Sequence, residues 1–227
     1  MTAGLPPALG LFGGTFDPIH NGHIAMARSA VQRHGLDRLL LVPAWQPPHK
    51  TDRVLTEWRH RFAMATLACR DLDRVEVSAV EKTRSGMSFT VETLQHFRHQ
   101  VGPDAPILFL MGSDSLAELP AWKDHARLLE LAHILVAPRP GVERETALAA
   151  LGAELAGCAV AEQSSRPGPP TDPAGSILWL EWQPRELSGS EIRRCVGAGE
   201  SIEDLVPPSV AAYILQHRIY PESRSMP

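Results

Sequence analysis

The chain of 227 residues has few cysteines. Cys69, Cys158 and Cys195 are widely separated and show no Cys-x-x-Cys spacing. The sequence therefore predicts neither a disulfide framework nor a zinc site, and it favours thiols in a reducing compartment.

Long hydrophobic runs are absent from the sequence. No apolar run reaches the length needed to cross a bilayer. Residues 1–7 lack both the basic start and the hydrophobic stretch of a secretory signal. We therefore expect a cytoplasmic protein with no membrane partner.

An excess of positive charge is also missing. The formal net charge is -4 and the predicted pI is about 6.2, which argues against a general nucleic-acid binder. Positive charge must then be local. If the substrates are polyanionic nucleotides, a few cations such as Lys50, Arg139 and Arg193 would have to converge on one cleft.

The chain does have enough apolar residues, 44% of the total, to bury a substantial core in one α/β domain. Short apolar runs predict strands at 8–12, 38–42, 75–80, 107–111, 133–137 and 176–182. Helical patterns predict helices at 24–35, 56–70, 88–100, 122–131, 188–197 and 209–217, with a weak one at 145–155. The alternation is typical of right-handed βαβ units, with Thr56 as a helix cap and 164–175 as a mobile loop.

The most informative segment is 13–23, GGTFDPIHNGH, where the first predicted strand turns into the first predicted helix. Glycines let the main chain approach an anion closely, and the N–H groups of a first helical turn favour negative charge. His20 and His23, three residues apart, would project from one face and could donate hydrogen bonds to one triphosphate. An HxxH pair alone is more often a surface or packing pair, but this setting favours a phosphate site.

The segment resembles the nucleotidyltransferase superfamily signature GxFDPxHxGH and matches it through His23. The resemblance implies a doubly wound, Rossmann-like α/β fold, with a parallel sheet and a small C-terminal helical part at about 188–227 of a single domain, 1–227. It also implies adenylyl transfer from ATP, with His20 and His23 on the phosphates. Four further residues of the loop are assigned to the ATP site: Gly13, Gly14, Thr15 and Phe16.

A second glycine and carboxylate follow the fourth predicted strand. Gly112 permits close approach, and Asp114 could accept hydrogen bonds from a ribose or could cap the next helix. The superfamily's GxD motif falls here, which implies contacts of both residues with the adenosine half of the nucleotide.

Residues 187–193, LSGSEIR, resemble the ISSTxIR motif found near the end of these enzymes. Ser188 and Glu191 form a capping-box pattern that needs no ligand. The helix start is nevertheless a second anion site, and the resemblance places Ser190 and Arg193 on the ATP phosphates. Gly189 replaces the usual second serine and puts one phosphate contact in doubt.

The adenylyl acceptor is indicated by residues 88–94, SFTVETL, which are similar to the SYTxDTL segment of nicotinate-nucleotide adenylyltransferases. In that family a tryptophan at the place of Trp122 stacks on the pyridine ring, and main-chain N–H groups near Thr90 and Lys123 bind its carboxylate. Trp122 could instead be a packing residue. Lys50, in a PPHK segment, would reach the phosphates or the second substrate, although alone it reads as a solvated charge.

The resemblance covers nearly the whole chain except about 141–176. It implies transfer of AMP from ATP, with Mg²⁺, to nicotinate mononucleotide in NAD biosynthesis, giving nicotinic acid adenine dinucleotide and pyrophosphate. Nicotinamide mononucleotide or 4′-phosphopantetheine as acceptor and CTP as donor stay open, as do a non-catalytic nucleotide sensor and a homo-oligomer. A class I aminoacyl-tRNA synthetase is disfavoured because the chain is short and acidic and lacks a KMSKS element.

Overall fold

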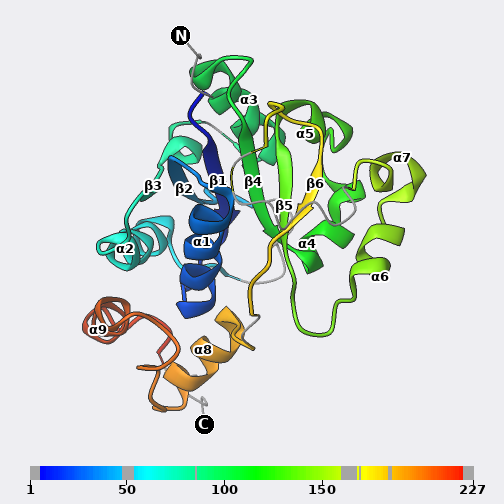
Figure 1. Ribbon diagram of the computed structural model, residues 1–227. Coiled ribbons are helices and arrows are strands. Elements are labelled where there is room, and N and C mark those ends of the chain that lie inside the picture. The colour runs from blue at the N-terminus through cyan, green and yellow to red at the C-terminus, as the bar shows by residue number, and fades with distance from the viewer. Residues whose placement is uncertain are drawn as a thin grey trace.

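A computed structural model describes residues 6–47, 54–84, 86–159, 168, 170–183 and 186–221. Its centre is a six-stranded sheet in the order β3-β2-β1-β4-β5-β6, with every neighbouring pair parallel (Figure 1). The strands are β1 (Leu9–Gly14), β2 (Arg38–Pro43), β3 (Val75–Val77), β4 (Ile107–Gly112), β5 (His133–Ala137) and β6 (Ile177–Trp179). The predicted α/β fold is confirmed.

The central strands are buried on both faces, which explains their continuous apolar runs. In β2, Leu39 and Leu41 face one hydrophobic core while Leu40 and Val42 face the other. Alternate side chains of a strand point to opposite faces, so each run supplies both cores. The sheet therefore needs helices on both sides.

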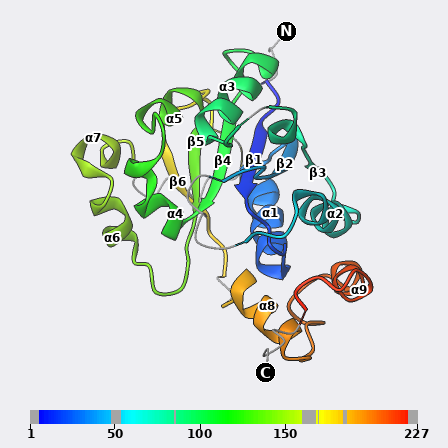
Figure 2. The same cartoon turned by 180° about the vertical axis from the view of Figure 1, so that it is seen from behind.

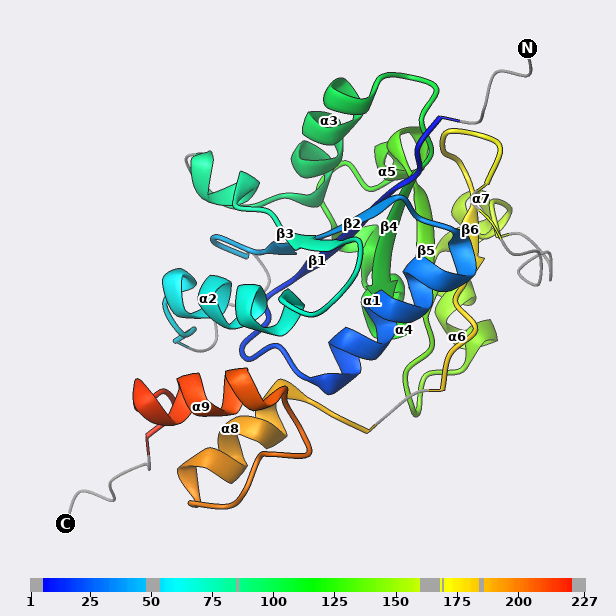
Figure 3. The ribbon, with the colours of Figure 1, turned by 60° about the vertical axis from the view of Figure 1, so that its left-hand side comes forward.

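Helices cover both faces, as the view along the sheet shows (Figure 3). One side carries α1 (Asn21–His34) and α2 (Trp58–Cys69), and the other carries α3 (Thr90–Val101) and α5 (Ala126–Leu131). The remaining helices are α4 (Ser113–Ala117), α6 (Arg144–Ala149), α7 (Gly152–Ala156), α8 (Gly189–Gly197) and α9 (Pro208–Gln216), with 3₁₀ turns η1 (Val80–Thr83) and η2 (Leu119–Ala121).

The last two helices lie below the body of the molecule, as both Figure 1 and the view from behind show (Figure 2). Their buried residues Ile192, Val210 and Ile214 belong to the same hydrophobic cluster as Ile24 and Met64 of α1 and α2. This shared core joins the C-terminal helices to one face of the sheet. The boundary at about 188 and the single domain over 1–227 stay predictions.

The strand order fixes where a ligand can bind. The chain crosses from β1 outward to β2 and β3, and then returns to β4 on the other side of β1. In open α/β sheets the ligand crevice lies at the carboxyl ends of the strands, at this point of reversal. The loops after β1 and β4 are therefore the expected site.

Two expectations about helix starts were wrong. The first helix begins at Asn21, not at 24, so His20 is its N-cap and His23 lies in its first turn. Thr56 does not cap α2: the N-cap is Glu57, with no side-chain cap bond, and the Thr56 N–H donates to Asp17 Oδ2 at 3.5 Å. Thr56 therefore bonds the loop after β1 and does not cap α2.

Other boundaries also differ. Trp122 lies in an extended conformation between η2 and α5, so the helix predicted at 122–131 starts later. The helix predicted at 145–155 is two short helices, because Gly152 has a positive φ of 74°. The sixth strand is shorter than 176–182, and the third ends before η1.

The loop predicted at 164–175 lies partly outside the described residues. Its end is tied to the sheet: the Pro173 carbonyl accepts from Ile107 N and from an Arg98 guanidinium nitrogen. Within the described ranges, no helix is both long and apolar enough to cross a membrane.

Candidate active site

A cavity of about 380 Å³ opens where β1 and β4 end. It collects all ten residues that the resemblance assigns to ATP: Gly13, Gly14, Thr15, Phe16, His20, His23, Gly112, Asp114, Ser190 and Arg193. These come from the end of β1, the loop after it and the first turn of α1, from the end of β4 with the start of α4, and from α8. We call this space the first cavity.

The two histidines cap their own helix. His20 Nδ1 accepts from the His23 N–H at 3.4 Å, and His23 Nδ1 accepts from the His20 N–H at 3.2 Å, so the pair forms a reciprocal capping box. The rings stack with centroids 3.6 Å apart. Because each Nδ1 is an acceptor, the ring proton sits on each Nε2, which is then a donor.

His20 is buried, with 3% of its surface exposed. Burial, and secondarily the positive charge of Arg139, lowers the pKa of His20 from 6.5 to about 4. The ring is therefore neutral at pH 7. A neutral imidazole can still donate one hydrogen bond to a phosphate oxygen without adding a buried charge.

Gly22 makes this ring arrangement possible. A Cβ at this position would lie 3.0 Å from His20 Nδ1, within a distance that real side chains rarely tolerate. The absence of a side chain therefore lets the His20 ring fold back over the start of α1.

Arg193 ties α8 to the loop after β1. Its Nη1 donates to the Asp17 carbonyl at 2.6 Å and its Nη2 donates to Ser190 Oγ at 2.9 Å. Gly189 permits this approach, because a Cβ there would lie 2.8 Å from the Asp17 carbonyl oxygen. The capping box predicted for Ser188 is half formed: Ser188 Oγ accepts from the Glu191 N–H at 3.2 Å, and no return bond from the Glu191 side chain is present in the described structure.

Asp114 pairs with an arginine that also lines the first cavity. Its Oδ1 lies 3.7 Å from Arg139 Nε, and Arg139 follows β5. Asp114 is not the cap of α4, because the N-cap is Gly112. Arg139 and Arg193 line one cavity, as expected for cations that bind a polyanionic nucleotide. Lys50, the third cation expected there, lies outside the described residues.

A second cavity of about 210 Å³ adjoins the first. Thr90, Trp122 and Lys123, predicted to bind the mononucleotide, line it. Gly13, Gly14, Thr15, Phe109, Ser115 and Trp122 line both cavities. We call Gly13, Gly14 and Thr15, which line both cavities at the carboxyl end of β1, their shared floor.

The start of α3 faces the second cavity. Thr90 is the first residue of this twelve-residue helix, and the N-cap residue, Phe89, makes no side-chain cap bond. Lys123 Nζ lies 2.8 Å from Glu92 Oε1 and 4.4 Å from the Phe89 ring centroid. Trp122 packs edge-on against Phe109, with ring centroids 6.4 Å apart. An aromatic face and a helix N-terminus therefore meet in this cavity.

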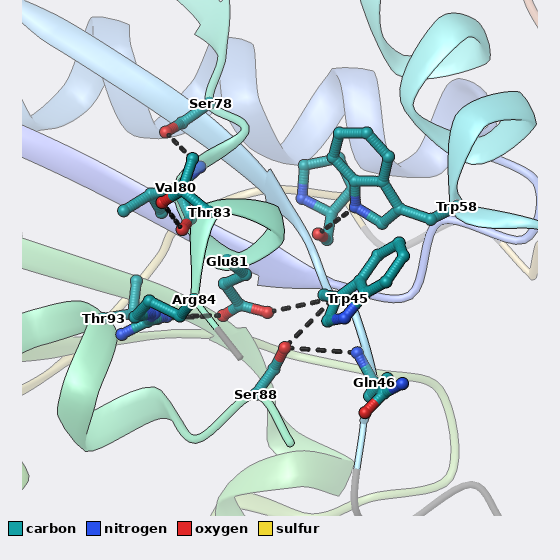
Figure 4. A network of polar contacts seen from close by, with 11 residues as sticks. Trp45, Gln46, Trp58, Ser78, Val80, Glu81, Thr83, Arg84, Ser88 and Thr93 are labelled. Atoms are coloured by element: carbon teal, nitrogen blue, oxygen red, sulfur yellow. Dashed lines mark hydrogen bonds and ion pairs between the residues drawn. The ribbon is translucent and has the colours of Figure 1, made fainter. Parts of the chain in front are cut away.

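A buried carboxylate holds one wall of the second cavity together (Figure 4). Glu81, 8% exposed, accepts from the Trp45 N–H at 3.2 Å and from Thr93 Oγ1 at 2.9 Å. Ser88 Oγ accepts from the N–H groups of Trp45 and Gln46. The loop after β2 is thereby joined to η1 and α3.

No group of three histidine, cysteine, aspartate or glutamate side chains among the described residues could hold a metal ion. Asp17 and Asp114 are the carboxylates among the residues that line the first cavity.

The sequence pattern of the family described as cytidylyltransferase-like matches residues 11–195. A protein of Pseudomonas putida (strain W619), named "Probable nicotinate-nucleotide adenylyltransferase", is 36% identical over 213 residues, which cover 93% of this chain and 94% of that protein. A relative of the same name from Pelobacter propionicus is 37% identical over 220 residues, covering 94% of this chain and 98% of that protein.

The chain belongs to the nicotinate-nucleotide adenylyltransferase family. The family membership predicted from the sequence is confirmed. Among solved structures, the nicotinic acid mononucleotide adenylyltransferase of Plasmodium falciparum complexed with NaAD superposes with a TM-score of 0.71 at 19% identity, covering 94% of this chain and 97% of that chain. This likeness supports the fold.

Sequence reasoning missed two residues of the two cavities: Asp17 was read only as part of the signature, and Glu81 was not singled out. Arg139 was expected to share one cleft with Arg193, and both line the first cavity. Arg139 had a usable signal, because it follows a central strand at the carboxyl edge of the sheet. Glu81 had none, because its partners come from separate elements.

Proposed function

We propose that this protein transfers the AMP group of ATP to nicotinate mononucleotide, giving nicotinic acid adenine dinucleotide and pyrophosphate. One observation carries the proposal. Two adjoining cavities share the floor Gly13–Thr15, with a histidine pair over the first and an aromatic ring with a helix start over the second. Such a pair of sites suits two substrates whose phosphate groups must come together.

The proposed reaction needs no general base. The attacking oxygen of the mononucleotide phosphate is already an anion at neutral pH, so catalysis consists of alignment and stabilisation of charge. His20 and His23 supply Nε2–H donors to the phosphates of ATP, and Arg193 supplies positive charge beside them. Gly112 and Asp114 hold the adenosine half.

The second cavity fits a pyridine carboxylate. Trp122 stacks on the ring, and the first N–H groups of α3 at Thr90, together with the main chain near Lys123, bind the carboxylate. A helix start favours a negative charge, typically by about 0.3–1 kcal/mol at an exposed site. This preference favours nicotinate over nicotinamide, which is neutral at the same position.

Magnesium enters with ATP. Its preferred partners are oxygens in an octahedral shell that usually retains several waters. The phosphates and water would hold the ion, which would supply positive charge to the pyrophosphate oxygens. Lys50, outside the described residues, would reach the phosphates or the second substrate. We further infer a cytoplasmic enzyme that acts on small molecules and not on nucleic acid.

A panel of acceptors tests the proposal. Purified protein with ATP and Mg²⁺ is given nicotinate mononucleotide, nicotinamide mononucleotide or 4′-phosphopantetheine, and pyrophosphate release is measured. We expect the highest kcat/KM with nicotinate mononucleotide. A higher value with either other acceptor would reject this substrate, and ATP binding without release from any of them would identify a nucleotide sensor.

A further inference from the structure

The carboxylate of Asp17 is buried beside the first cavity and bonded from two distant parts of the chain. Asp17 is 5% exposed. Its Oδ1 accepts from the Tyr220 hydroxyl at 2.7 Å, and its Oδ2 accepts from the Thr56 N–H at 3.5 Å. A carboxylate committed to these donors holds the backbone of the loop between β1 and α1.

The chain turns back on itself after α9 to bring Tyr220 to this carboxylate. Arg218 and Tyr220 have positive φ angles of 49° and 62°, a backbone region that residues other than glycine seldom occupy. Ile219, between them, is 7% exposed and its N–H donates to the Ile214 carbonyl at 3.0 Å. The packing of Ile219 and the bond of Tyr220 maintain this reversal.

Other residues of the C-terminal part fix the same loop. The Asn21 N–H donates to the Leu205 carbonyl at 2.9 Å, and Asn21 Nδ2 donates to the Asp204 carbonyl at 2.9 Å. Arg193 donates to the Asp17 carbonyl, as described above. The loop that carries His20 is thus held on both flanks by residues 193–220.

We infer that Tyr220 is a positioning residue for the phosphate-binding loop: its hydroxyl, through the Asp17 carboxylate, sets the placement of His20 and His23. The inference rests on the proposed ATP site. Tyr220 does not line the first cavity, so it acts through Asp17 and not on the ligand.

The phenol is suited to this role because it stays a donor. Burial, and then the neighbouring Asp17 carboxylate, raises the pKa of Tyr220 above its usual value. The hydroxyl proton is therefore retained across the pH range in which the protein would work. The Tyr220 hydroxyl can therefore donate to Asp17 Oδ1 throughout this pH range.

The chain offers a matched control, because it contains two tyrosines. The hydroxyl of Tyr213 lies 3.0 Å from His60 Nδ1, between α9 and α2 and away from the residues that line either cavity. Tyr220→Phe and Tyr213→Phe each remove one hydroxyl from the C-terminal part. They differ in whether that hydroxyl reaches the loop.

The test measures kcat and both KM values by pyrophosphate release, and the Kd of a non-hydrolysable ATP analogue by calorimetry. Tyr220→Phe should lower kcat/KM for ATP and weaken the analogue about tenfold, the size expected for one hydrogen bond to a charged group. KM for nicotinate mononucleotide should stay within about twofold, and Tyr213→Phe should change none of these values beyond that range. In an Asp17→Ala background, Tyr220→Phe should have no further effect.

Unchanged ATP kinetics and unchanged analogue binding in Tyr220→Phe would overturn the inference, and so would an equal loss in Tyr213→Phe. The analogue measurement separates this inference from the proposed function. If the unaltered protein binds the analogue but releases no pyrophosphate with nicotinate mononucleotide, the acceptor assignment fails while the Kd comparison still decides the role of Tyr220.

Discussion

At the scale of single residues, His20 and His23 have a structural role and a proposed chemical role. Their Nδ1 atoms cap α1 and their Nε2 atoms carry the donor protons. The three-residue spacing predicted that both rings would lie near one helix start. It could not predict the reciprocal bonds, because these depend on ring rotamers and on the close approach that Gly22 permits.

Replacing a histidine with alanine tests both roles. His20→Ala or His23→Ala removes one donor to charge that develops on the phosphates, which typically costs about two to three powers of ten in kcat. His20→Ala should also lower the free energy of unfolding by about 1 kcal/mol through loss of the cap. Steady-state kinetics and urea unfolding measure the two effects.

His20→Asn is the matched variant, because an asparagine oxygen can cap α1 but cannot place a donor where Nε2 lies. It should retain the stability of the unaltered protein and lose kcat as His20→Ala does. Near-normal turnover in the alanine variants of both histidines would contradict the role given to the pair.

Trp122 is tested through the substrate it is expected to touch. Trp122→Ala removes the ring proposed to stack on the pyridine, so KM for nicotinate mononucleotide should rise by about tenfold, within the range of an aromatic pair and its buried area. Trp122→Phe, which keeps an aromatic face, should restore much of the loss. A rise confined to KM for ATP would show that the ring serves the first cavity.

At the scale of elements, the central strands were predictable and the connections were not. Continuous apolar runs locate β1, β2, β4 and β5 to within about two residues, because these strands are buried on both faces. The start of α5 was misplaced because Trp122 is extended and Asp124 has a positive φ of 49°, so the helix cannot include these residues. The extended residue that follows η2 is Trp122, which lines both cavities.

The Glu81 network makes an element-level prediction. Glu81→Gln keeps the size of the side chain but replaces one acceptor oxygen with an NH₂ group. This group would face either the Thr93 hydroxyl or the Trp45 N–H, which is itself also bonded to Ser88 Oγ. The free energy of unfolding should fall by about 1–3 kcal/mol, because a buried donor loses its charged acceptor. KM for the mononucleotide should rise while KM for ATP holds, because the network forms the wall of the second cavity.

Glu76→Gln is the control for this change. Glu76 pairs with Arg38 at the surface, where both side chains are more than half exposed. Such pairs typically contribute less than about 1 kcal/mol. If Glu81→Gln were as mild as Glu76→Gln in both stability and KM, the wall would not depend on the buried carboxylate.

At the scale of the whole molecule, the sequence predicted the α/β fold and the family, while contacts between distant segments left no signal in it. Tyr220 and Asp17 are 203 positions apart, and nothing in either residue type indicates the other. Asp17 and Asn21 are bonded to Thr56, before α2, and to residues 193–220. The precise form of the site therefore depends on the assembled chain.

Buried histidines give the molecule a pH dependence. Burial first, and then nearby positive charge, lowers the pKa of His20 and of His34 from 6.5 to about 4. The unfolded chain takes up these protons below pH 6.5 while the folded chain does not until about pH 4, so stability falls as the pH falls through this window. Each residue should remove about 2 kcal/mol from the free energy of unfolding between pH 7 and pH 5.

Urea unfolding at several pH values measures this slope. His34→Gln should reduce the loss between pH 7 and pH 5 by about 2 kcal/mol. His99→Gln, at an exposed position of α3, should leave the slope unchanged. A slope that is the same in all three proteins would show that His34 does not carry the effect.

The shared floor of the two cavities has a consequence for inhibitor design. Gly13, Gly14 and Thr15 line both spaces, so the two cavities adjoin along this short stretch of main chain. A single compound with one fragment shaped for each space would hold its second fragment at a high effective concentration once the first is seated. Its length, more than the affinity of either fragment, would then decide its potency.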